Sequence, residues 1–358
     1  MKTTTNTEKN LIVDICIYLV MPCVVFIGII GNVLSILVFA RREMIKFRVF
    51  IFAIVLAVSN ILLLTTSVFN IILPDFYGEF LTDKSVFWCH FHGYFDLLLT
   101  ALSSYSVLCI SVERWFSVCM PFKNARYVNF KTVLLTVISY RGASAPAQNY
   151  TSVSTFVSLW LPFTVNYTWE QRKCELLRPT VYKVCGIISI IVTHIVPFVF
   201  LVILDILIVH RLKTNHYDTS MQHSVLPKNN RTATNSSTRK RIKRQGNVDR
   251  NITFMLITVG VTFMVMTFPY PIYWLYVQIR QTTMSNKTVF ILTQTFRYLN
   301  CCCHFFIYSA ASSLFCRELR KMFRCIKHRD RKLNNDQRTK PFNTMNKRDI
   351  LPEHKNLL

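Results

Sequence analysis

Residues 89–122 read CHFHGYFDLLLTALSSYSVLCISVERWFSVCMPF, and this stretch decides the fold. It opens with a cysteine and continues as an apolar segment long enough to cross a bilayer as a helix that rises about 1.5 Å per residue. It closes on Glu113, Arg114 and Trp115. Asp96 lies near its start, and an ionisable residue inside an apolar span is costly and usually functional. The stretch therefore predicts a transmembrane helix with an acid near one end and a charged pair at the other.

The composition of the whole chain favours a membrane protein with several spans. Of its 358 residues, 51% are hydrophobic and only 17% are charged, which excludes an ordinary soluble domain. Most of the 12 cysteines lie inside apolar runs, where a thiol packs as a small hydrophobe, so we expect no metal site. The net charge of +24 comes from basic residues in alternate loops, which indicates contact with anionic lipid headgroups and not with nucleic acid.

The chain contains further apolar segments of the same kind. Arg41 and Arg42 follow the first segment at once, which places the next loop in the cytoplasm and the N-terminus outside. Besides the helix that begins at Cys89, the expected spans are about Leu11–Ala40, Val49–Leu73, Val184–Val209, Ile252–Tyr276 and Thr288–Ala311, with a fourth span in two pieces.

The fourth span is interrupted. Thr132–Tyr140 and Val153–Val165 are apolar but each is too short to cross, whereas together they supply 22 residues, enough for one crossing at roughly 20 residues per span. Residues 141–152 between them begin with Arg141 and are polar. We interpret them as an insertion in this helix that arises from a misplaced splice boundary; the alternative is a kinked or re-entrant helix.

These spans carry motifs that resemble those of the rhodopsin-like (class A) G-protein-coupled receptors. The matching positions, in chain order, are Gly31-Asn32, Cys89, Glu113-Arg114-Trp115, Cys174, Pro197, Phe263 with Pro269, and Tyr308. The chain also departs from the family pattern at several positions. Asn60 replaces the aspartate of helix 2, Thr267 the tryptophan of helix 6, and His304-Phe305 the Asn-Pro of helix 7. Such departures resemble invertebrate receptors for FMRFamide-type neuropeptides.

The resemblance implies an all-α fold, a bundle of seven transmembrane helices with an amphipathic eighth helix on the cytoplasmic face. It also implies a disulfide between Cys89 and Cys174. The expected organisation is an extracellular N-terminus at 1–10, a receptor domain at 11–325 with a cytoplasmic loop at 211–250, and a disordered tail at 326–358. Asn166 and Asn286 stand in glycosylation sequons, and Cys325 is a candidate for palmitoylation at the end of the eighth helix.

The function that the resemblance implies is signalling at the plasma membrane through a heterotrimeric G protein, with arrestin as a further partner. The switch residues carried over are Glu113, Arg114, Asp249, Pro269 and Tyr308, with outward movement of helix 6 on activation. We expect no enzyme and no cofactor, because the sequence has no Gly-rich phosphate loop and its histidines are scattered. A multi-spanning transporter is the competing class, but no internal repeat is visible.

The ligand is predicted from Asp96, which lies two helical turns inside Cys89 and should point into the outer cavity of the bundle. By resemblance, an aspartate here binds a cationic group of the agonist, and Tyr298, Gln294, Tyr270 and Trp274 complete the site. A short cationic neuropeptide is favoured over a biogenic amine, since the outer end of helix 6 is bulky and aromatic. Without a carboxylate at position 60, we expect no sodium site within the bundle.

Overall fold

The computed structural model describes residues 11–78, 80–119, 165–168, 173–225, 234–280 and 286–324, with side chains omitted at 165–168, 173, 175–176 and 215–249. The fourth span and its insertion, residues 132–165, fall almost entirely outside these ranges. The chain divides into two compact units, Met1–Cys316 and Arg317–Leu358. The account below concerns the first unit unless stated otherwise.

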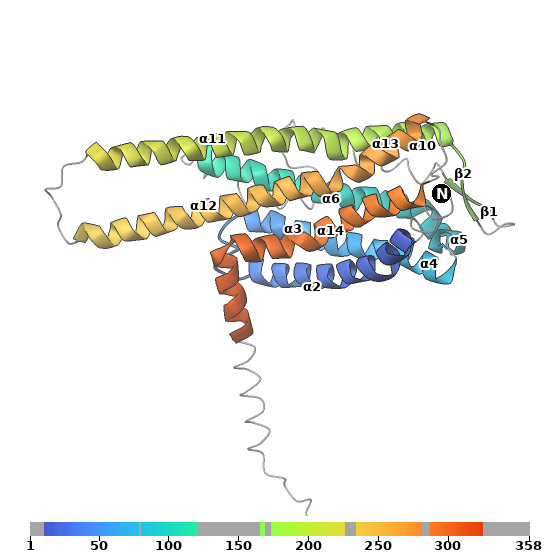
Figure 1. The fold of residues 1–358 in the computed structure, drawn as a ribbon, viewed down its shortest axis with the longest axis horizontal. Coiled ribbons are helices and arrows are strands. Elements are labelled where there is room, and N and C mark those ends of the chain that lie inside the picture. Colours follow the sequence, from blue (N-terminus) through green and yellow to red (C-terminus); the bar gives the residue numbers. More distant parts are fainter. Residues whose placement is uncertain are drawn as a thin grey trace, which may run out of the picture. The chain divides into compact units, whose positions relative to one another are not determined.

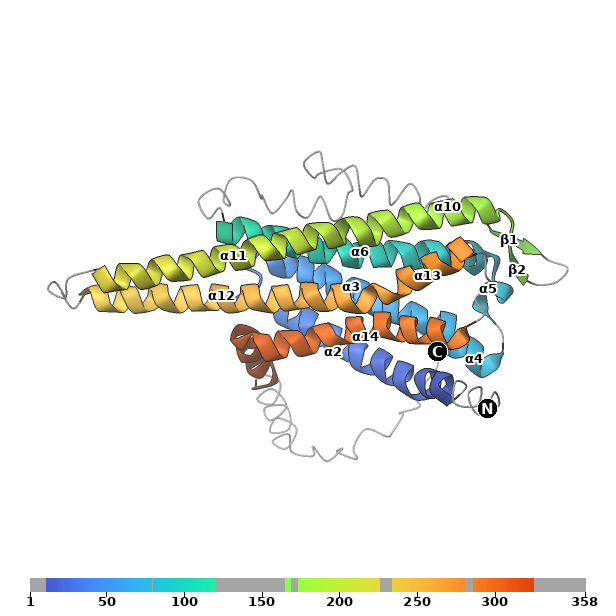
Figure 2. The same ribbon diagram turned by 45° about the horizontal axis from the view of Figure 1, so that its top comes forward.

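The first unit is built from long helices that run alongside one another (Figures 1 and 2). Their order begins with η1 (Cys16–Val20), α2 (Met21–Phe39), α3 (Val49–Ser67), η2 (Val68–Ile72), α4 (Leu73–Tyr77), α5 (Leu81–Lys84) and α6 (Val86–Cys119). After the strands β1 (Val165–Thr168) and β2 (Lys173–Leu176) come α10 (Pro179–Ile190), η4 (Ile191–Ile195), α11 (Val196–Val225), α12 (Thr234–Thr267), α13 (Pro269–Arg280) and α14 (Lys287–Ala311).

Five helical segments in the described ranges are long and apolar enough to cross a membrane. They are Leu11–Phe39, Val49–Tyr77, Val86–Cys119, Pro179–Thr214 and Arg250–Arg280. A sixth is obtained if Lys287–Ala311 and Ser313–Arg324, which are separated by a sharp bend, are counted as one broken span. Each of the five contains a segment that the sequence predicted, because a long apolar run has no stable state in a bilayer other than a helix with all its backbone groups bonded internally.

The helices that correspond to spans 1, 2 and 7 pack together around Phe39. The fully buried ring of Phe39 lies 4.9 Å from that of Phe50, 5.0 Å from that of Tyr308 and 5.4 Å from that of Phe315. Close approach of α2 and α14 depends on small residues, since a Cβ added to Gly31 would lie 2.9 Å from the Cβ of Phe305. This glycine belongs to the Gly31-Asn32 pair, so the motif has a packing reason.

The sixth span is broken at a proline. α12 ends at Thr267 and α13 begins at Pro269, and the two helices diverge visibly there in Figure 1. The backbone bonds that bridge the break, from Phe268 to Met264 and from Ile272 to Phe268, are both long at 3.3 Å. Proline supplies no N–H and crowds the preceding turn, which accounts for the break at this position.

The segment 211–250, which we expect to be a cytoplasmic loop that extends the flanking helices at its ends, is largely helical in its described part. α11 continues to Val225 and α12 begins at Thr234, so helix occupies most of that range. The polar composition that suggested a loop does not oppose helix formation, because Lys, Arg and Gln are good helix formers. In the second unit, the helix that begins in the first at Ser313 continues to Arg324, and Glu318 accepts a 2.8 Å bond from Lys321 one turn later.

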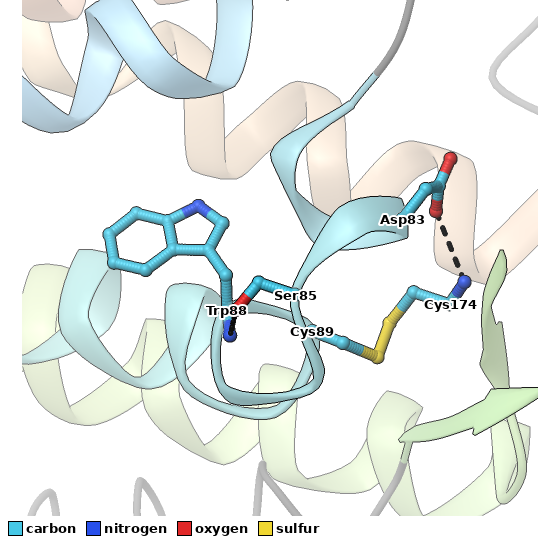
Figure 3. The surroundings of a disulfide bond; sticks show 5 residues. All are labelled: Asp83, Ser85, Trp88, Cys89 and Cys174. Atoms are coloured by element: carbon cyan, nitrogen blue, oxygen red, sulfur yellow. Dashed lines mark hydrogen bonds between the residues drawn. A yellow bond between two sulfur atoms is a disulfide. The ribbon is translucent and has the colours of Figure 1, made fainter. Parts of the chain in front are cut away.

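A small hairpin follows the undescribed fourth span. β1 and β2 pair antiparallel with Tyr167 opposite Cys174, and this hairpin was not predicted. Cys174 forms the disulfide with Cys89 on α6, and its backbone N–H donates to the Asp83 carboxylate on α5 at 3.1 Å (Figure 3). The predicted disulfide is confirmed, and it fastens the hairpin to the outer end of α6.

Candidate functional site

A cavity of about 550 Å³ opens beside the disulfide, between α6, α10, α13 and α14. All five residues that the sequence proposed for ligand binding line it: Asp96 on α6, Tyr270 and Trp274 on α13, and Gln294 and Tyr298 on α14. Cys174 lines it as well. Three helices distant in sequence therefore bring the predicted residues to one place, and the volume lies within the range typical of ligand pockets.

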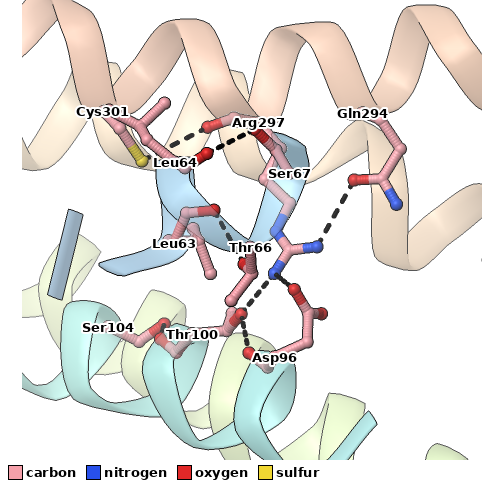
Figure 4. A network of polar contacts seen from close by, with 10 residues as sticks. All are labelled: Leu63, Leu64, Thr66, Ser67, Asp96, Thr100, Ser104, Gln294, Arg297 and Cys301. Carbon is pink, nitrogen blue, oxygen red and sulfur yellow. Dashed lines mark hydrogen bonds and ion pairs between the residues drawn. The ribbon is translucent and has the colours of Figure 1, made fainter. Parts of the chain in front are cut away.

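The Asp96 carboxylate has a partner inside the protein. One of its oxygens accepts a 2.8 Å bond from the Nη2 of Arg297 on α14 (Figure 4). The two side chains differ in burial, since that of Arg297 is 4% exposed and that of Asp96 is 27% exposed. Asp96 is thus an acid at the cavity wall whose charge is balanced by a deeply buried guanidinium.

Arg297 is held from several directions. Its Nη2 also donates to the Thr100 hydroxyl at 2.6 Å, and its Nη1 donates to Gln294 at 3.3 Å (Figure 4). The Thr100 hydroxyl in turn donates a hydrogen bond to the backbone carbonyl of Asp96 at 2.7 Å. The guanidinium carbon lies 5.2 Å from the ring centre of Tyr270 and 5.7 Å from that of Tyr298, within range of cation–π attraction.

Sequence reasoning missed Arg297. The signal was present, because Arg297 is a charged residue inside the predicted span Thr288–Ala311, and the argument that singled out Asp96 applies equally to a base. Arg297 and Asp96 should have been read together as a pair between helices 3 and 7.

Gly186 on α10 allows the Trp274 side chain to pack closely against the helix backbone at the cavity wall. A Cβ added to Gly186 on α10 would collide with the six-membered ring of Trp274 on α13. Both residues line the cavity, and Trp274 is 7% exposed. The indole therefore lies flush against the α10 backbone, and any side chain at position 186 would push it into the cavity.

Below the cavity lies a neutral polar cluster. The Asn32 side chain donates to the carbonyl of Cys301 on α14 at 2.9 Å and to that of Gly28 on its own helix at 2.7 Å. The Asn60 amide donates to the Asn32 oxygen at 3.2 Å and meets the Nδ1 of His304 at 2.9 Å. Because an amide nitrogen can only donate, Nδ1 accepts, and the imidazole proton resides on Nε2. Here Asn60 and His304, two of the departures from the family pattern, bond to each other.

Three of the predicted switch residues, Glu113, Arg114 and Tyr308, do not line the cavity. Arg114 and Glu113 form an ion pair at 3.1 Å, and both are buried, with side chains 5% and 9% exposed. Tyr308 is 1% exposed in the aromatic cluster around Phe39. Asp249 lies within α12, but its side chain is not described, so its contact with Arg114 stays a prediction.

The modification sites stay predictions. Asn286 immediately precedes α14 and is exposed, as glycosylation requires. Asn166 lies on β1, with its side chain outside the described set, and Cys325 follows the last described residue.

Comparison with known proteins agrees with this arrangement. Residues 31–308 match the model of the 7 transmembrane receptor (rhodopsin family). The chain therefore belongs to the rhodopsin family of seven-transmembrane receptors, a family of receptors and not of enzymes. It is a multi-pass membrane protein whose architecture is a bundle of seven helices.

Its curated relatives are receptors named for peptides. The chain is 28% identical to the cholecystokinin receptor type A of Rattus norvegicus and of Homo sapiens, over 45% of its own length. These alignments span only about a third of those relatives, 35% and 36% respectively. The thyrotropin-releasing hormone receptor of Gallus gallus is 21% identical over 90% of this chain and 82% of its own length.

Proposed function

We propose that this chain is a plasma-membrane receptor for a short extracellular peptide and that it signals through a heterotrimeric G protein. The observation that carries the proposal is the cavity beside the Cys89–Cys174 disulfide, lined by aromatic rings and by a charged pair. Such a cavity suits the end of a peptide, whose side chains need apolar walls and whose charged or amide groups need a few fixed polar partners. Relatives named as peptide receptors support the same reading.

The finer identity of the ligand rests on the sequence. A resemblance to FMRFamide-type receptors favours a peptide with a positive group directed at Asp96, and a biogenic amine is the alternative. The Arg297 pair bears on both, because a ligand cation at Asp96 has to share or replace a guanidinium already bound there.

The proposed signal passes from the cavity to the cytoplasmic end through helix 6. Trp274 and Tyr270 on α13 contact the ligand, and the break at Pro269 is the hinge about which α12 swings outward. Release of Arg114 from Glu113 then opens the surface that the G protein occupies. A ligand drives this change to the extent that it binds the open state more tightly than the closed one.

The test is a panel of short peptides and biogenic amines applied to cells that report calcium and cyclic AMP. We expect at least one peptide to activate the wild-type receptor at submicromolar concentration. Trp274→Ala should then weaken that peptide by about tenfold or more, since aromatic anchors in desolvated pockets carry much of the binding energy.

Tyr276→Ala is the matched control, because Tyr276 lies on the same helix α13 but is 55% exposed and does not line the cavity. It should leave potency within about threefold of wild type, as expected of a surface substitution. Activation by an amine and by no peptide would replace the proposal with the amine alternative. Equal losses in the two variants would show that the cavity is not the binding site.

A further inference from the structure

Arg297 is more deeply buried than Asp96, and this difference in burial bears on the charge of the ligand group that the cavity can bind. We infer that Arg297 recognises an acidic group of the agonist, such as a peptide carboxylate, which takes the place of Asp96 on the guanidinium. This inference rests on the proposal that a peptide binds in this cavity, and it assigns the peptide an acidic group here instead of the cationic group that the sequence resemblance favours.

The first step concerns which partner can be released. A ligand cation that draws Asp96 away leaves Arg297 without its counter-charge, at 4% exposure, where water cannot replace the lost partner. A ligand anion that replaces Asp96 leaves Arg297 paired and releases an acid that is already 27% exposed. Because an uncompensated buried charge is far more costly than a hydrated one, exchange of the acid is the easier route.

The second step concerns how Arg297 is held. Its contacts with Thr100, Gln294, Tyr270 and Tyr298 do not depend on Asp96, so the guanidinium stays in place when Asp96 leaves. A fixed donor group loses little freedom when it binds a ligand, which favours affinity.

The third step concerns unused donors. Asp96 makes a single bond to Arg297 through one oxygen, whereas a guanidinium can bind a carboxylate through two parallel bonds. The Nε of Arg297 is buried and has no hydrogen-bond partner among the described residues. The single hydrogen bond between Arg297 and Asp96 is therefore a weaker interaction than the two parallel bonds that an incoming carboxylate can form with the guanidinium.

The fourth step concerns the rest of the wall. Among the described residues that line the cavity, Asp96 and Arg297 are the only acid and the only arginine or lysine. An acidic ligand group thus meets one like charge, which can move into water, and one opposite charge, which cannot.

The first experiment needs no knowledge of the agonist. Asp96→Ala removes the internal carboxylate, and acetate is offered in its place to the purified full-length protein. Acetate should raise the melting temperature of Asp96→Ala by roughly 2 to 4 °C more than that of wild type, at concentrations several times its dissociation constant.

Two variants control this result. Asp96→Ala with Arg297→Gln should show no such rise, because the binding cation is gone. Asp75→Ala removes the acid from the exposed ion pair between Asp75 and Lys287 of α14. That pair is also 2.8 Å long but lies outside the cavity. The Asp75→Ala variant should therefore respond to acetate no more than wild type. If acetate stabilises Asp96→Ala no more than it stabilises the double variant, Arg297 does not take up a carboxylate from the cavity and the inference is overturned.

The second experiment measures the potency of agonists in signalling. Substitutions of Asp96 and Arg297 should change this potency in opposite directions for an acidic and for a cationic ligand group. Each panel peptide is made with a free carboxylate and with an amide at its C-terminus, and with its acidic side chains retained or neutralised. Asp96→Asn, which keeps the shape of the side chain, removes a competitor and should raise the potency of the acid-bearing form by about threefold or more. Arg297→Gln should lower it by about a hundredfold, as for a buried pair that loses one member.

The reverse pattern, loss with Asp96→Asn and gain with Arg297→Gln, would identify a cationic ligand group at Asp96 and overturn the inference. Equal losses in both variants and in their combination would make the pair a structural tie only, and would overturn it too. If no peptide activates the wild-type receptor, the proposed function fails while the acetate experiment still decides the role of Arg297.

Discussion

At the scale of single residues, two of the departures from the family pattern contact each other. Asn60 stands where the family has an aspartate and His304 where it has an asparagine, and the two side chains meet at 2.9 Å. A neutral amide and a neutral imidazole satisfy each other in part without an ion. A sodium ion bound there would lack the negative charge that offsets its loss of hydration.

The consequence is a prediction about sodium. Replacing sodium chloride with choline chloride should leave the melting temperature of the purified receptor unchanged. Asn60→Asp combined with His304→Asn should create a sodium-dependent rise of roughly 2 to 4 °C, because it supplies the carboxylate and removes the imidazole that would otherwise pair with it. A marked sodium effect on the wild-type protein would contradict this account.

Single residues also show which parts of the cavity could be predicted from the sequence and which could not. Asp96, Tyr270, Trp274, Gln294 and Tyr298 were assigned to one cavity by the family resemblance, and only the depth of Asp96 followed from its spacing from Cys89 along a helix. The contact of Gly186 with Trp274 was not accessible in this way, because it depends on how closely α10 approaches α13.

At the scale of elements, the helices were predictable and their ends and connections less so. The predicted span Ile252–Tyr276 lies inside the observed segment Arg250–Arg280, and Val184–Val209 lies inside Pro179–Thr214. An apolar run marks the part of a helix in the bilayer, whereas polar residues continue the helix beyond it without a hydrophobic signal. The strands β1 and β2 were missed because four residues each are too short to display an alternating pattern.

The packing of α2 gives a prediction at this scale. Phe39→Ala should lower the thermal stability of the receptor by several degrees, since it leaves a cavity among Phe50, Tyr308 and Phe315. In soluble cores a Phe→Ala change costs about 3 to 5 kcal/mol. We expect the lower end of this range here, because lipid also gives the Phe39 ring an apolar environment when the helices are separated.

Phe26 on the same helix provides the control. It is 69% exposed, so Phe26→Ala removes the same group without opening an internal cavity, and thermal stability should stay within about a degree of wild type. Equal destabilisation by both variants, measured by melting in detergent, would mean that the aromatic cluster around Phe39 adds nothing beyond ordinary helix contact.

At the scale of the whole molecule, two ion pairs, one partly exposed and one buried, include residues of the same helix α6. Asp96 pairs with Arg297 near the cavity, and Arg114 pairs with Glu113 near the other end of α6. Both sit where the proposed activation requires movement, one at the ligand and one at the G protein. A buried pair is sensitive to small displacements, because its attraction must offset the desolvation of both charges.

The last prediction concerns the resting state of the cytoplasmic end. Glu113→Gln removes the partner of Arg114 in the closed bundle and should raise ligand-independent signalling about fivefold for each 1 kcal/mol by which the closed state is destabilised. Asp249→Ala should act in the same direction if α12 contributes a second contact to Arg114.

Glu43→Ala is the control, because Glu43 is a half-exposed acid that pairs only with the neighbouring Lys46 in the described structure, so basal signalling should not change. Basal cyclic AMP and calcium, measured at matched surface expression, decide the matter. An unchanged basal level in Glu113→Gln would show that the 3.1 Å pair does not restrain the closed state, whereas a change in Glu113→Gln without one in Asp249→Ala would assign the restraint to helix 3 alone.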